Sequence, residues 1–298
     1  MAEHTPVLLE ETMNALRPER GGVFVDATLG LGGHTLEMIA RAEEAKQPIR
    51  IIGIDQDPYA LEFAEERLGE KIEYLQGNFA ELFQLRKKKI ITAADGILMD
   101  IGVSSYQIDT PERGFSFMKN GPLDMRMDPD GTVSAATIVN TWPEHRIIEM
   151  LLSYGEERLA KKIAHAIVER RKKQRFTETA DLAAVIIEQY HPTARHKKPH
   201  PATRSFQALR IAVNRELDSL VEGMDQALEL LSTGGVLAII TFHSLEDRIV
   251  KQRFRAASDS GEYELLSKKP VVASRTEEVA NPRSRSAKLR AIRHLPKP

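Results

Sequence analysis

The stretch Val23-Phe-Val-Asp-Ala-Thr-Leu-Gly-Leu-Gly-Gly-His34 joins an apolar run to an acid and then to a glycine-rich turn. The apolar run has the composition of a buried parallel strand, and the residues after His34 have the composition of a helix. A strand, a glycine turn and a helix in this order are typical of a cofactor-binding turn in an α/β fold. The spacing Gly30-x-Gly32-Gly33 lacks the last glycine of the dinucleotide fingerprint, and no Lys-Ser/Thr pair follows to complete a P-loop. By itself, such a turn is equally compatible with an ordinary tight turn.

Two later apolar runs repeat the pattern of a strand that ends in an acid. Arg50 to Asp55 and Gly96 to Asp100 are both followed by polar or small residues. The carboxyl ends of parallel strands meet at one edge of a sheet, where ligands bind, so we expect Asp26, Asp55 and Asp100 to lie close together. Asp55 follows Gly32 by 23 residues, an offset at which an acid accepts hydrogen bonds from ribose hydroxyls. The alternative role, a helix N-cap, suits Asp57 better because Pro58 follows it.

Two further predicted strands end in polar residues. Ile72 to Phe79 ends in Asn78 and Phe79, an amide and an aromatic ring that suit an adenine. The strand that begins at Gly234 opens into His243 and Ser244, which we take as secondary catalytic candidates. Together, these five strand ends favour a nucleoside cofactor. The missing third glycine favours S-adenosylmethionine over a dinucleotide, because no pyrophosphate then has to be bound.

Composition restricts the remaining possibilities. The chain has 298 residues, enough for one large α/β domain with an insertion, and it contains no Cys. The lack of Cys excludes disulfides, thiolate-ligated zinc and a cysteine nucleophile. The first residues carry no targeting segment, and no apolar run approaches the ~20 residues needed to span a bilayer. We expect a soluble, cytoplasmic protein that does not bind membranes.

Charge is distributed unevenly along the chain. The net charge is −1, but Glu156 to Arg210 holds 13 Lys/Arg against 6 Asp/Glu, and Leu245 to Pro298 holds 13 against 7. Two basic segments on an acidic body indicate a polyanionic partner. Helix faces exposed to solvent and a flexible C-terminal tail would explain the same uneven distribution of charge.

The order of patterns predicts three parts: a first part of a catalytic domain over residues 1–106, an inserted all-helical domain over 107–205, and the second part of the catalytic domain with a basic C-terminal tail over 206–298. Tyr106 to Pro143 is rich in Pro, Gly and Asp and reads as irregular. Helical patterns fill Pro143 to Tyr190, and one long helix is expected from Phe206 to Leu231. Ser258 to Pro298 reads as a mostly polar tail.

Several residues of the insertion are candidates for binding RNA. Arg113, Phe115 and Phe117 interleave a guanidinium with aromatic rings, and both groups stack on unpaired bases. The basic run that includes Arg171, Lys172 and Lys173 would contact phosphates, although cations at a helix end also complement the helix dipole. His191, His196 and His200 lie in a proline-rich loop with no Cys or carboxylate to complete a ligand set, so we expect no metal site.

Asp100 and the turn of small residues after it indicate that the acceptor of the methyl group is an amine. Amino-methyltransferases carry an Asp/Asn-Pro-Pro-aromatic motif at this place, and here Ile101-Gly102-Val103 replaces the prolines. We expect Asp100 and the carbonyl groups of Ile101 and Gly102 to lie nearest the transferred methyl group.

With these residues in view, the sequence resembles the bacterial 16S ribosomal RNA cytosine-N4 methyltransferase family over nearly its whole length. The most specific pieces are His4-Thr-Pro-Val-Leu-Leu, Gly32-Gly-His34, Asp100-Ile-Gly-Val-Ser-Ser105, Arg113-Gly-Phe-Ser-Phe, Gly121-Pro-Leu-Asp-Met-Arg-Met-Asp128, Tyr154-Gly-Glu-Glu-Arg158, His200-Pro-Ala-Thr-Arg204, Phe242-His-Ser-Leu-Glu-Asp-Arg248 and Asn281-Pro-Arg-Ser-Arg285.

The resemblance implies a Rossmann-like class I S-adenosylmethionine-dependent methyltransferase fold with an inserted helical domain. It implies transfer of a methyl group to N4 of a cytidine in 16S ribosomal RNA, in the decoding centre of the small ribosomal subunit. It also carries cofactor-binding roles onto Gly32, Gly33, His34, Asp55, Phe79, Asp100 and Gln107, and we add Arg204 to the RNA-binding candidates.

Three alternatives stay open at this point. A nicotinamide-dependent oxidoreductase is disfavoured by the glycine spacing, a DNA amino-methyltransferase would use a similar edge of the sheet, and a non-catalytic RNA-binding assembly factor could retain the fold. The sequence also leaves open whether the chain forms a homodimer.

Overall fold

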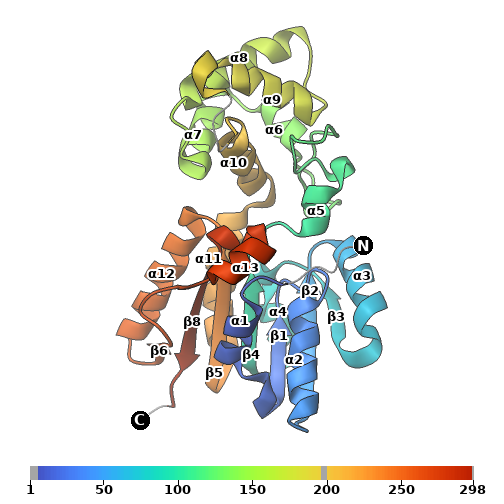
Figure 1. The fold of residues 1–298 in the computed structure, drawn as a ribbon, viewed down its shortest axis with the longest axis vertical. Coiled ribbons are helices and arrows are strands. Elements are labelled where there is room, and N and C mark those ends of the chain that lie inside the picture. Colours follow the sequence, from blue (N-terminus) through green and yellow to red (C-terminus); the bar gives the residue numbers. More distant parts are fainter. Residues whose placement is uncertain (1–5, 196–199, 297–298) are drawn as a thin grey trace. The chain divides into compact units, whose positions relative to one another are not determined.

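The computed structural model describes residues 6–195 and 200–296, and the chain forms two compact units (Figure 1). The α/β unit comprises Met1–Gly102 together with Leu217–Pro298, and the helical unit comprises Val103–Glu216. The helical unit is therefore an insertion between two segments that share one sheet.

The α/β unit is built on one eight-stranded sheet with the order β3-β2-β1-β4-β5-β8-β6, and β7 also pairs with β8. Strands β3, β2, β1, β4 and β5 are parallel, whereas β8 runs antiparallel to β5, β6 and β7. The strands are β1 Gly22–Asp26, β2 Ile49–Asp55, β3 Glu73–Gln76, β4 Ala94–Asp100, β5 Leu231–Thr241, β6 Tyr263–Leu265, β7 Val271–Val272 and β8 Lys288–His294. The chain order reverses between β1 and β4, which makes this point of the sheet the expected ligand-binding position.

Helices cover both faces of this sheet. They are α1 Leu9–Leu16, α2 Gly33–Glu44, α3 Pro58–Leu68, α4 Phe83–Lys87, α11 Glu216–Leu230, α12 Ser244–Asp259 and α13 Arg275–Ala280, with short 3₁₀ turns η1 Pro18–Arg20, η2 Gly69–Lys71, η3 Phe79–Glu81 and η6 Pro282–Ser286. Alternate strand residues point to opposite faces: Ile52 and Met99 pack with Leu220 of α11, whereas Ile51 and Leu98 pack with Met38 of α2. Central strands buried on both faces explain the continuous apolar runs in the sequence.

The helical unit has its own apolar core. Its helices are α5 Ser105–Asp109, α6 Ala135–Thr141, α7 Glu144–Gly155, α8 Ala160–Lys173, α9 Thr179–Glu188 and α10 Thr203–Asn214, with 3₁₀ turns η4 Pro111–Arg113 and η5 Pro192–Ala194. Ile147, Ile163, Ile186 and Leu209 are buried in this core, each from a different helix. None of the described helices of either unit combines the length and hydropathy needed to cross a bilayer.

The structure differs from the expected boundaries around residue 215. The long helix expected from Phe206 to Leu231 is two helices, α10 and α11, because Arg215 between them adopts a left-handed conformation (φ 51°). Phe206 and Leu209 of α10 pack in the helical core, whereas Leu220 and Met224 of α11 pack on the sheet. The helical unit consequently extends to Glu216, rather than ending at residue 205.

The interpretation of Ser258 to Pro298 as a polar tail was wrong. This segment supplies β6, β7, α13 and β8, and β8 lies in the sheet between β5 and β6. Leu289 and Ile292 of β8 are buried, and the strand also carries the basic residues Lys288, Arg290 and Arg293. The expectation of an irregular segment from Tyr106 to Pro143 was also incomplete, because α5 and α6 lie within it.

Candidate active site

The carboxyl edge of the sheet brings together the three acids expected there. Asp26, Asp55 and Asp100 are the last residues of β1, β2 and β4, and these strands are neighbours in the sheet. The prediction that successive strands deliver acids to one edge is confirmed. Pairing of Asp26 with Gly53 and with Leu98 fixes the register, so Asp55 and Asp100 each extend two residues beyond the partner of Asp26.

Asp26 organises the interior of this edge. Its carboxylate accepts hydrogen bonds from the Thr35 hydroxyl (2.7 Å) and from the backbone N–H of Thr28 (3.3 Å), and only 1% of the residue is exposed. The Thr28 hydroxyl in turn accepts a hydrogen bond from the Asp100 N–H (2.6 Å). Asp26 therefore fixes the position of the loop after β1, and Thr28 links this loop to the end of β4.

Asp55 is held by backbone groups at both oxygens. Oδ2 accepts the N–H of Gly30 (2.8 Å), and Oδ1 accepts the N–H of Asp57 (2.9 Å). The Gln56 N–H also bonds to this carboxylate, so three backbone donors use three of its four lone pairs and one remains to accept a hydroxyl. Asp57 is the N-cap of α3 and accepts the N–H of Tyr59, which confirms the capping role expected for Asp57; ribose binding by Asp55 stays a prediction.

The glycines of the turn are required by packing. Gly32, the N-cap of α2, has a φ of +71°, and a Cβ there would lie 2.7 Å from Leu68 Cδ1. A Cβ on Gly33 would lie 2.5 Å from Pro6 Cγ. These two glycines let the first turn of α2 approach neighbouring segments of its own chain, which brings His34 to the sheet edge.

His34 lies between the N-terminal segment and Asp100. Its Nε2 is 3.1 Å from the carbonyl oxygen of Val7, and its Nδ1 is 3.8 Å from Asp100 Oδ2. Because a carbonyl oxygen only accepts, a hydrogen bond to Val7 places the proton on Nε2 and turns the Nδ1 lone pair of a neutral ring toward Asp100. The other Asp100 oxygen, Oδ1, is buried and has no hydrogen-bond partner among the described residues.

All three strand-end acids have raised pKa values. Burial is the largest cause, and it raises the pKa of Asp26 and of Asp55 to about 6. Burial and the nearby carboxylates of Asp26 and Glu246 raise the pKa of Asp100 to about 8, although a quarter of its side-chain surface is exposed. An acid with an unsatisfied buried oxygen and a raised pKa is suited to interact with a cation or an amine.

Asn78 and Phe79 follow β3 at the same edge. Asn78 caps η3 by accepting the N–H of Ala80 (2.9 Å), and its amide group donates to Gln56 (2.9 Å). Phe79 is half-buried, and a Cβ on Gly223 of α11 would lie 2.7 Å from its ring, so α11 packs directly against one part of the ring. Contact of this ring with an adenine stays a prediction.

His243, Ser244 and Glu246 lie where β5 leads into α12. His243 is the N-cap of this helix, and its Nε2 is 2.9 Å from Glu246 Oε1. Glu246 Oε2 accepts the N–H groups of Phe242 (2.8 Å) and His243 (3.1 Å). Ser244, the first residue of α12, is exposed. Sequence reasoning missed Glu246, whose signal is its place three residues after the N-cap, where a capping-box acid occurs.

Gln107 belongs to the helical unit. It lies in the first turn of α5, where its side chain accepts the N–H of Ser104 (3.1 Å) while its own N–H donates to the Ser104 hydroxyl (3.1 Å). Its amide group is therefore oriented by this reciprocal cap.

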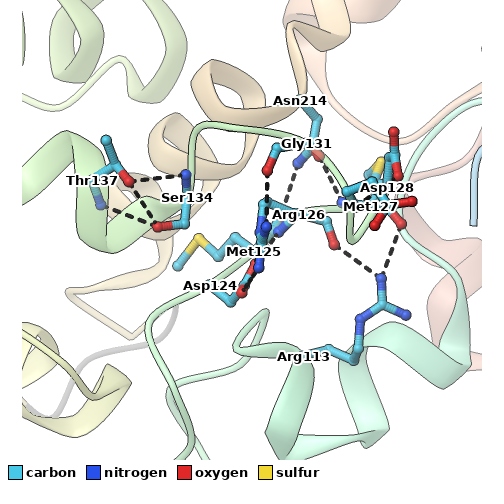
Figure 2. Close-up of polar contacts among 11 residues, drawn as sticks. Arg113, Asp124, Met125, Arg126, Met127, Asp128, Gly131, Ser134, Thr137 and Asn214 are labelled. Atoms are coloured by element: carbon cyan, nitrogen blue, oxygen red, sulfur yellow. Dashed lines mark hydrogen bonds and ion pairs between the residues drawn. The ribbon is translucent and has the colours of Figure 1, made fainter.

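Arg113 fixes a loop of the helical unit (Figure 2). Its guanidinium donates to the carbonyl oxygens of Arg126 (2.9 Å) and Met127 (3.0 Å). Arg126 in turn binds Asp124 at two points, 2.8 and 2.6 Å. Asn214 donates to the carbonyl oxygen of Met125, a residue with a φ of +65°, and so holds the turn from the side of α10. The expected irregular loop is thus an ordered scaffold.

Three other RNA-binding candidates also have partners in the helical unit. Phe115 and Phe117 pack against its core, and the Phe117 ring stacks on His200 with 4.5 Å between ring centroids. Arg204 donates to the carbonyl oxygen of Glu156 (3.0 Å). These contacts give Arg113, Phe115, Phe117 and Arg204 structural roles, and their contact with RNA stays a prediction. His196 of the same loop, and His4 of the first sequence piece, lie outside the described residues.

The basic run at the end of α8 divides into one inward and several outward residues. Arg171 donates to the carbonyl oxygens of Val139 and Trp142, both at 2.8 Å, and thereby joins α8 to the end of α6. Lys172 is exposed and pairs with Glu169, and Lys173 is exposed. Arg171 is thus a structural residue as well as a candidate contact for phosphate.

Acids at the ends of three neighbouring parallel strands, beside a glycine turn that opens a helix, are typical of α/β proteins that bind a nucleoside cofactor at this edge of the sheet. The sequence profile of the MraW methylase family matches residues 1–295, and the chain belongs to this family. It is a methyltransferase with a mixed α/β fold, and S-adenosylmethionine is its cofactor.

Several relatives share its full length. Proteins named ribosomal RNA small subunit methyltransferase H are 46% identical in Carboxydothermus hydrogenoformans (98% of each chain), 45% in Symbiobacterium thermophilum (97% of this chain, 96% of the relative) and 42% in Persephonella marina (99% of this chain, 100% of the relative). Among solved structures, an rRNA methylase from Streptococcus thermophilus is similar with a TM-score of 0.45 and 11% identity over 99% of both chains.

Proposed function

We propose that this methyltransferase transfers a methyl group from S-adenosylmethionine to the exocyclic N4 of a cytidine in 16S ribosomal RNA, in the decoding centre of the small ribosomal subunit, in the cytoplasm. The names of the full-length relatives support a small-subunit ribosomal RNA substrate. The observation that carries the choice of an amine acceptor is Asp100, whose buried Oδ1 accepts no hydrogen bond from the described residues.

The cofactor would be held at the carboxyl edge of the sheet. Asp55 has a lone pair left for a ribose hydroxyl, and the half-buried ring of Phe79 suits the adenine. The turn at Gly32 and Gly33 brings His34 to the edge, where it and Asp100 would bind the amino-acid part. Gln107 is a separate candidate for contact with the cofactor; it belongs to the helical unit, where Ser104 fixes its side chain.

The chemistry requires control of the cytosine amine. When bound, S-adenosylmethionine supplies a methyl group that the N4 nitrogen takes as the carbon–sulfur bond breaks toward sulfur. The N4 lone pair is delocalised into the ring, so acceptors that hold the amine protons and favour a pyramidal nitrogen lower the barrier. Asp100 and the carbonyl groups of Ile101 and Gly102 would supply these acceptors. Alignment of the reacting atoms would supply most of the remaining acceleration.

Asp100 is also the proposed acceptor of the proton that the amine loses. A general base works best with a pKa near the working pH, and the pKa of Asp100 is about 8. Its second oxygen faces His34 Nδ1 at 3.8 Å, too far for a direct hydrogen bond, so transfer of the proton to His34 would need a closer approach or a bridging water. His243 and Ser244 are secondary candidates, and His243 is oriented by Glu246.

RNA would be bound by cations of the helical unit. Lys161, Lys162, Lys172, Lys173 and Arg175 of α8 and its C-terminal end are exposed. Contacts of this kind neutralise phosphates and position the RNA without reading its sequence. The cytidine itself would be recognised unpaired, because the N4 edge of a paired cytosine is engaged.

Methyl transfer from labelled S-adenosylmethionine to three acceptors tests this proposal. The acceptors are small ribosomal subunits that lack the modification, free 16S RNA, and double-stranded DNA. We expect label in the ribosomal RNA of the subunits or in the free RNA, and none in DNA. Label in DNA would favour the DNA amino-methyltransferase, and cofactor binding without any transfer would favour the assembly factor.

A further inference from the structure

The segment Pro6–Leu8 lies directly against the proposed cofactor site. Val7 supplies the carbonyl oxygen that His34 Nε2 contacts at 3.1 Å, and the Pro6 ring fills the space where Gly33 lacks a side chain. Val7 is 6% exposed and Leu8 is completely buried. Leu8 also has a φ of +51°, which is uncommon for a residue other than glycine. The position of this segment therefore determines where the His34 ring lies.

A residue from the other end of the chain holds this segment. Glu277 Oε1 accepts the backbone N–H of Leu8 at 2.7 Å, across 269 residues of sequence. Glu277 lies on α13, and α13 and α1 both belong to the α/β unit (Figure 1). The bond is part-buried, which strengthens a hydrogen bond to a carboxylate relative to one in water.

The side chain of Glu277 is directed away from its own helix. Ser274 is the N-cap of α13 and accepts the N–H of Glu277 (3.1 Å), so Ser274-x-x-Glu277 has the sequence of a capping box. In a complete capping box the acid returns to the N–H of the N-cap residue, as Gln107 does in α5. Glu277 Oε1 instead accepts the N–H of Leu8. A residue at a capping-box position therefore makes a contact with a distant part of the chain.

We propose that Glu277 is a positioning residue for the cofactor site: through Leu8 and Val7 it fixes the His34 ring and its tautomer opposite Asp100. The chain of contacts runs from Glu277 Oε1 to Leu8 N–H, from the Val7 carbonyl to His34 Nε2, and from His34 Nδ1 to Asp100 Oδ2. The proposal rests on the proposed placement of S-adenosylmethionine at His34 and Asp100.

A purely structural role for Glu277 makes a different prediction. An acid at the N-terminus of α1 would stabilise that helix and its dipole wherever the ligand binds. Loss of such a cap lowers the melting temperature but leaves the affinity of the folded protein for the cofactor unchanged. Cofactor affinity and the His34 tautomer, measured well below the melting temperature, therefore separate the two roles.

The experiment compares Glu277→Ala, Glu277→Gln and Glu278→Ala in the full chain. Glu278 is the matched control, because it lies next to Glu277 on α13 and pairs with Arg275. Affinity for S-adenosylhomocysteine is measured by calorimetry, and the His34 ring nitrogens are followed by ¹⁵N NMR, with a His34→Gln variant to assign the signals. The melting temperature of each variant is recorded in parallel.

We expect Glu277→Ala to weaken cofactor affinity about 10-fold, the factor that corresponds to about 1.4 kcal/mol for one hydrogen bond to a charged group. Its His34 signals should change from the Nε2-protonated tautomer to a mixture. Glu277→Gln keeps an oxygen acceptor and should stay within about 3-fold of the wild-type affinity, a loss below that of a whole hydrogen bond. Glu278→Ala should match the wild-type protein in both measurements.

Wild-type affinity and wild-type His34 signals in Glu277→Ala would overturn the positioning role, whatever the melting temperature. A Glu277→Gln protein as weak as Glu277→Ala would overturn the hydrogen-bond mechanism and assign the effect to charge. His34→Ala and Asp100→Ala serve as reference variants: if both bind the cofactor normally, the proposed site itself is wrong. If they lose binding and Glu277→Ala does not, only the role of Glu277 fails.

Discussion

The carboxyl group of Asp100 presents two different oxygens to the proposed site. Oδ2 faces His34 Nδ1 at 3.8 Å, whereas Oδ1 is buried without a hydrogen-bond partner among the described residues. An unsatisfied buried acceptor costs free energy, so its persistence at the end of a central strand fits a group that acquires its partner from a ligand. The neighbouring carboxylates of Asp26 and Glu246 add to this cost by repulsion.

The pH dependence of the reaction follows from Asp100. Only the ionised carboxylate can accept the amine proton, so kcat/KM should rise with pH and level off above about 8, the pKa of the free enzyme. Asp100→Asn should lose this rising limb and react about 10²–10⁴-fold more slowly. Initial rates across neutral and mildly alkaline pH measure both effects. An Asp100→Asn enzyme with the wild-type rate and profile would remove Asp100 from the chemistry.

Asp26 gives a prediction for stability. Its pKa of about 6 in the folded protein exceeds its ordinary value of 3.8, so folding favours the protonated form. Its contribution to the free energy of unfolding is complete below pH 3.8 and is lost as pH rises through about 6. Asp26→Asn removes this loss, and the Asn side chain can still accept from Thr28 and contact the Thr35 hydroxyl.

Relative to the wild-type protein, Asp26→Asn should therefore gain free energy of unfolding between acid and neutral pH, by at most about 3 kcal/mol. Urea unfolding at several pH values measures the difference. Glu70→Gln, which removes a negative charge from an exposed residue, is the matched control. A difference between Asp26→Asn and the wild-type protein that does not change with pH would show that folding does not raise the pKa of Asp26.

At the scale of secondary structure, β8 joins the C-terminal segment to the central sheet. It pairs with β5, β6 and β7, and its Arg290 and Lys288 both bind Asp247 of α12, at 2.8 and 2.9 Å. These contacts hold the pKa of Asp247 below its ordinary value despite partial burial. The segment is thus part of the sheet that carries the proposed site.

Truncation of buried side chains in β8 should destabilise the α/β unit. Ile292 is completely buried, so Ile292→Ala should lower the free energy of unfolding by about 2–5 kcal/mol through lost burial and the cavity left behind. Val279→Ala removes apolar atoms from a residue of α13 that is 71% exposed and should change stability by less than about 0.5 kcal/mol. Chemical unfolding of both variants measures the two losses of unfolding free energy. If the segment were a loose tail rather than a strand of the sheet, Ile292→Ala would cost no more than Val279→Ala.

The sequence revealed the parallel strands because strands buried on both faces are continuous apolar runs, and each of the three central ones closes on an acid. β8 was missed because Lys288, Arg290 and Arg293 interrupt its apolar residues without a regular alternation, and its burial depends on pairing with β5. The division between α10 and α11 was missed because Arg215 interrupts the helix without a Gly or Pro. The link from Glu277 to Leu8 spans 269 residues and has no local signal.

At the scale of the whole molecule, charge is divided between segments of different function. The net charge of −1 conceals the basic segment from Glu156 to Arg210, which forms much of the helical unit. The sheet edge of the α/β unit instead concentrates carboxylates, among them Asp26, Asp55 and Asp100. This division suits an enzyme that binds a cationic cofactor on one unit and a polyanion on the other.

The exposed lysines at the end of α8 test the binding of RNA. The double variant Lys172→Ala/Lys173→Ala should weaken RNA binding and make its salt dependence less steep, by about 0.7 in the logarithmic slope for each lost phosphate contact. Lys87→Ala/Lys88→Ala removes two exposed charges from the α/β unit and is the matched control. Cofactor affinity should not change in either variant. An unchanged salt dependence in the α8 variant would assign these lysines to a solvated helix end.

The most direct test of the proposed function is the chemical identity of the methylated nucleoside. Small ribosomal subunits that lack the modification are incubated with the protein and methyl-labelled S-adenosylmethionine, and the 16S RNA is digested and analysed by mass spectrometry. The proposed chemistry predicts N4-methylated cytidine at one position of the decoding centre. Label on C5 of cytosine, on another base or on ribose would contradict an acceptor site built around Asp100 for an exocyclic amine.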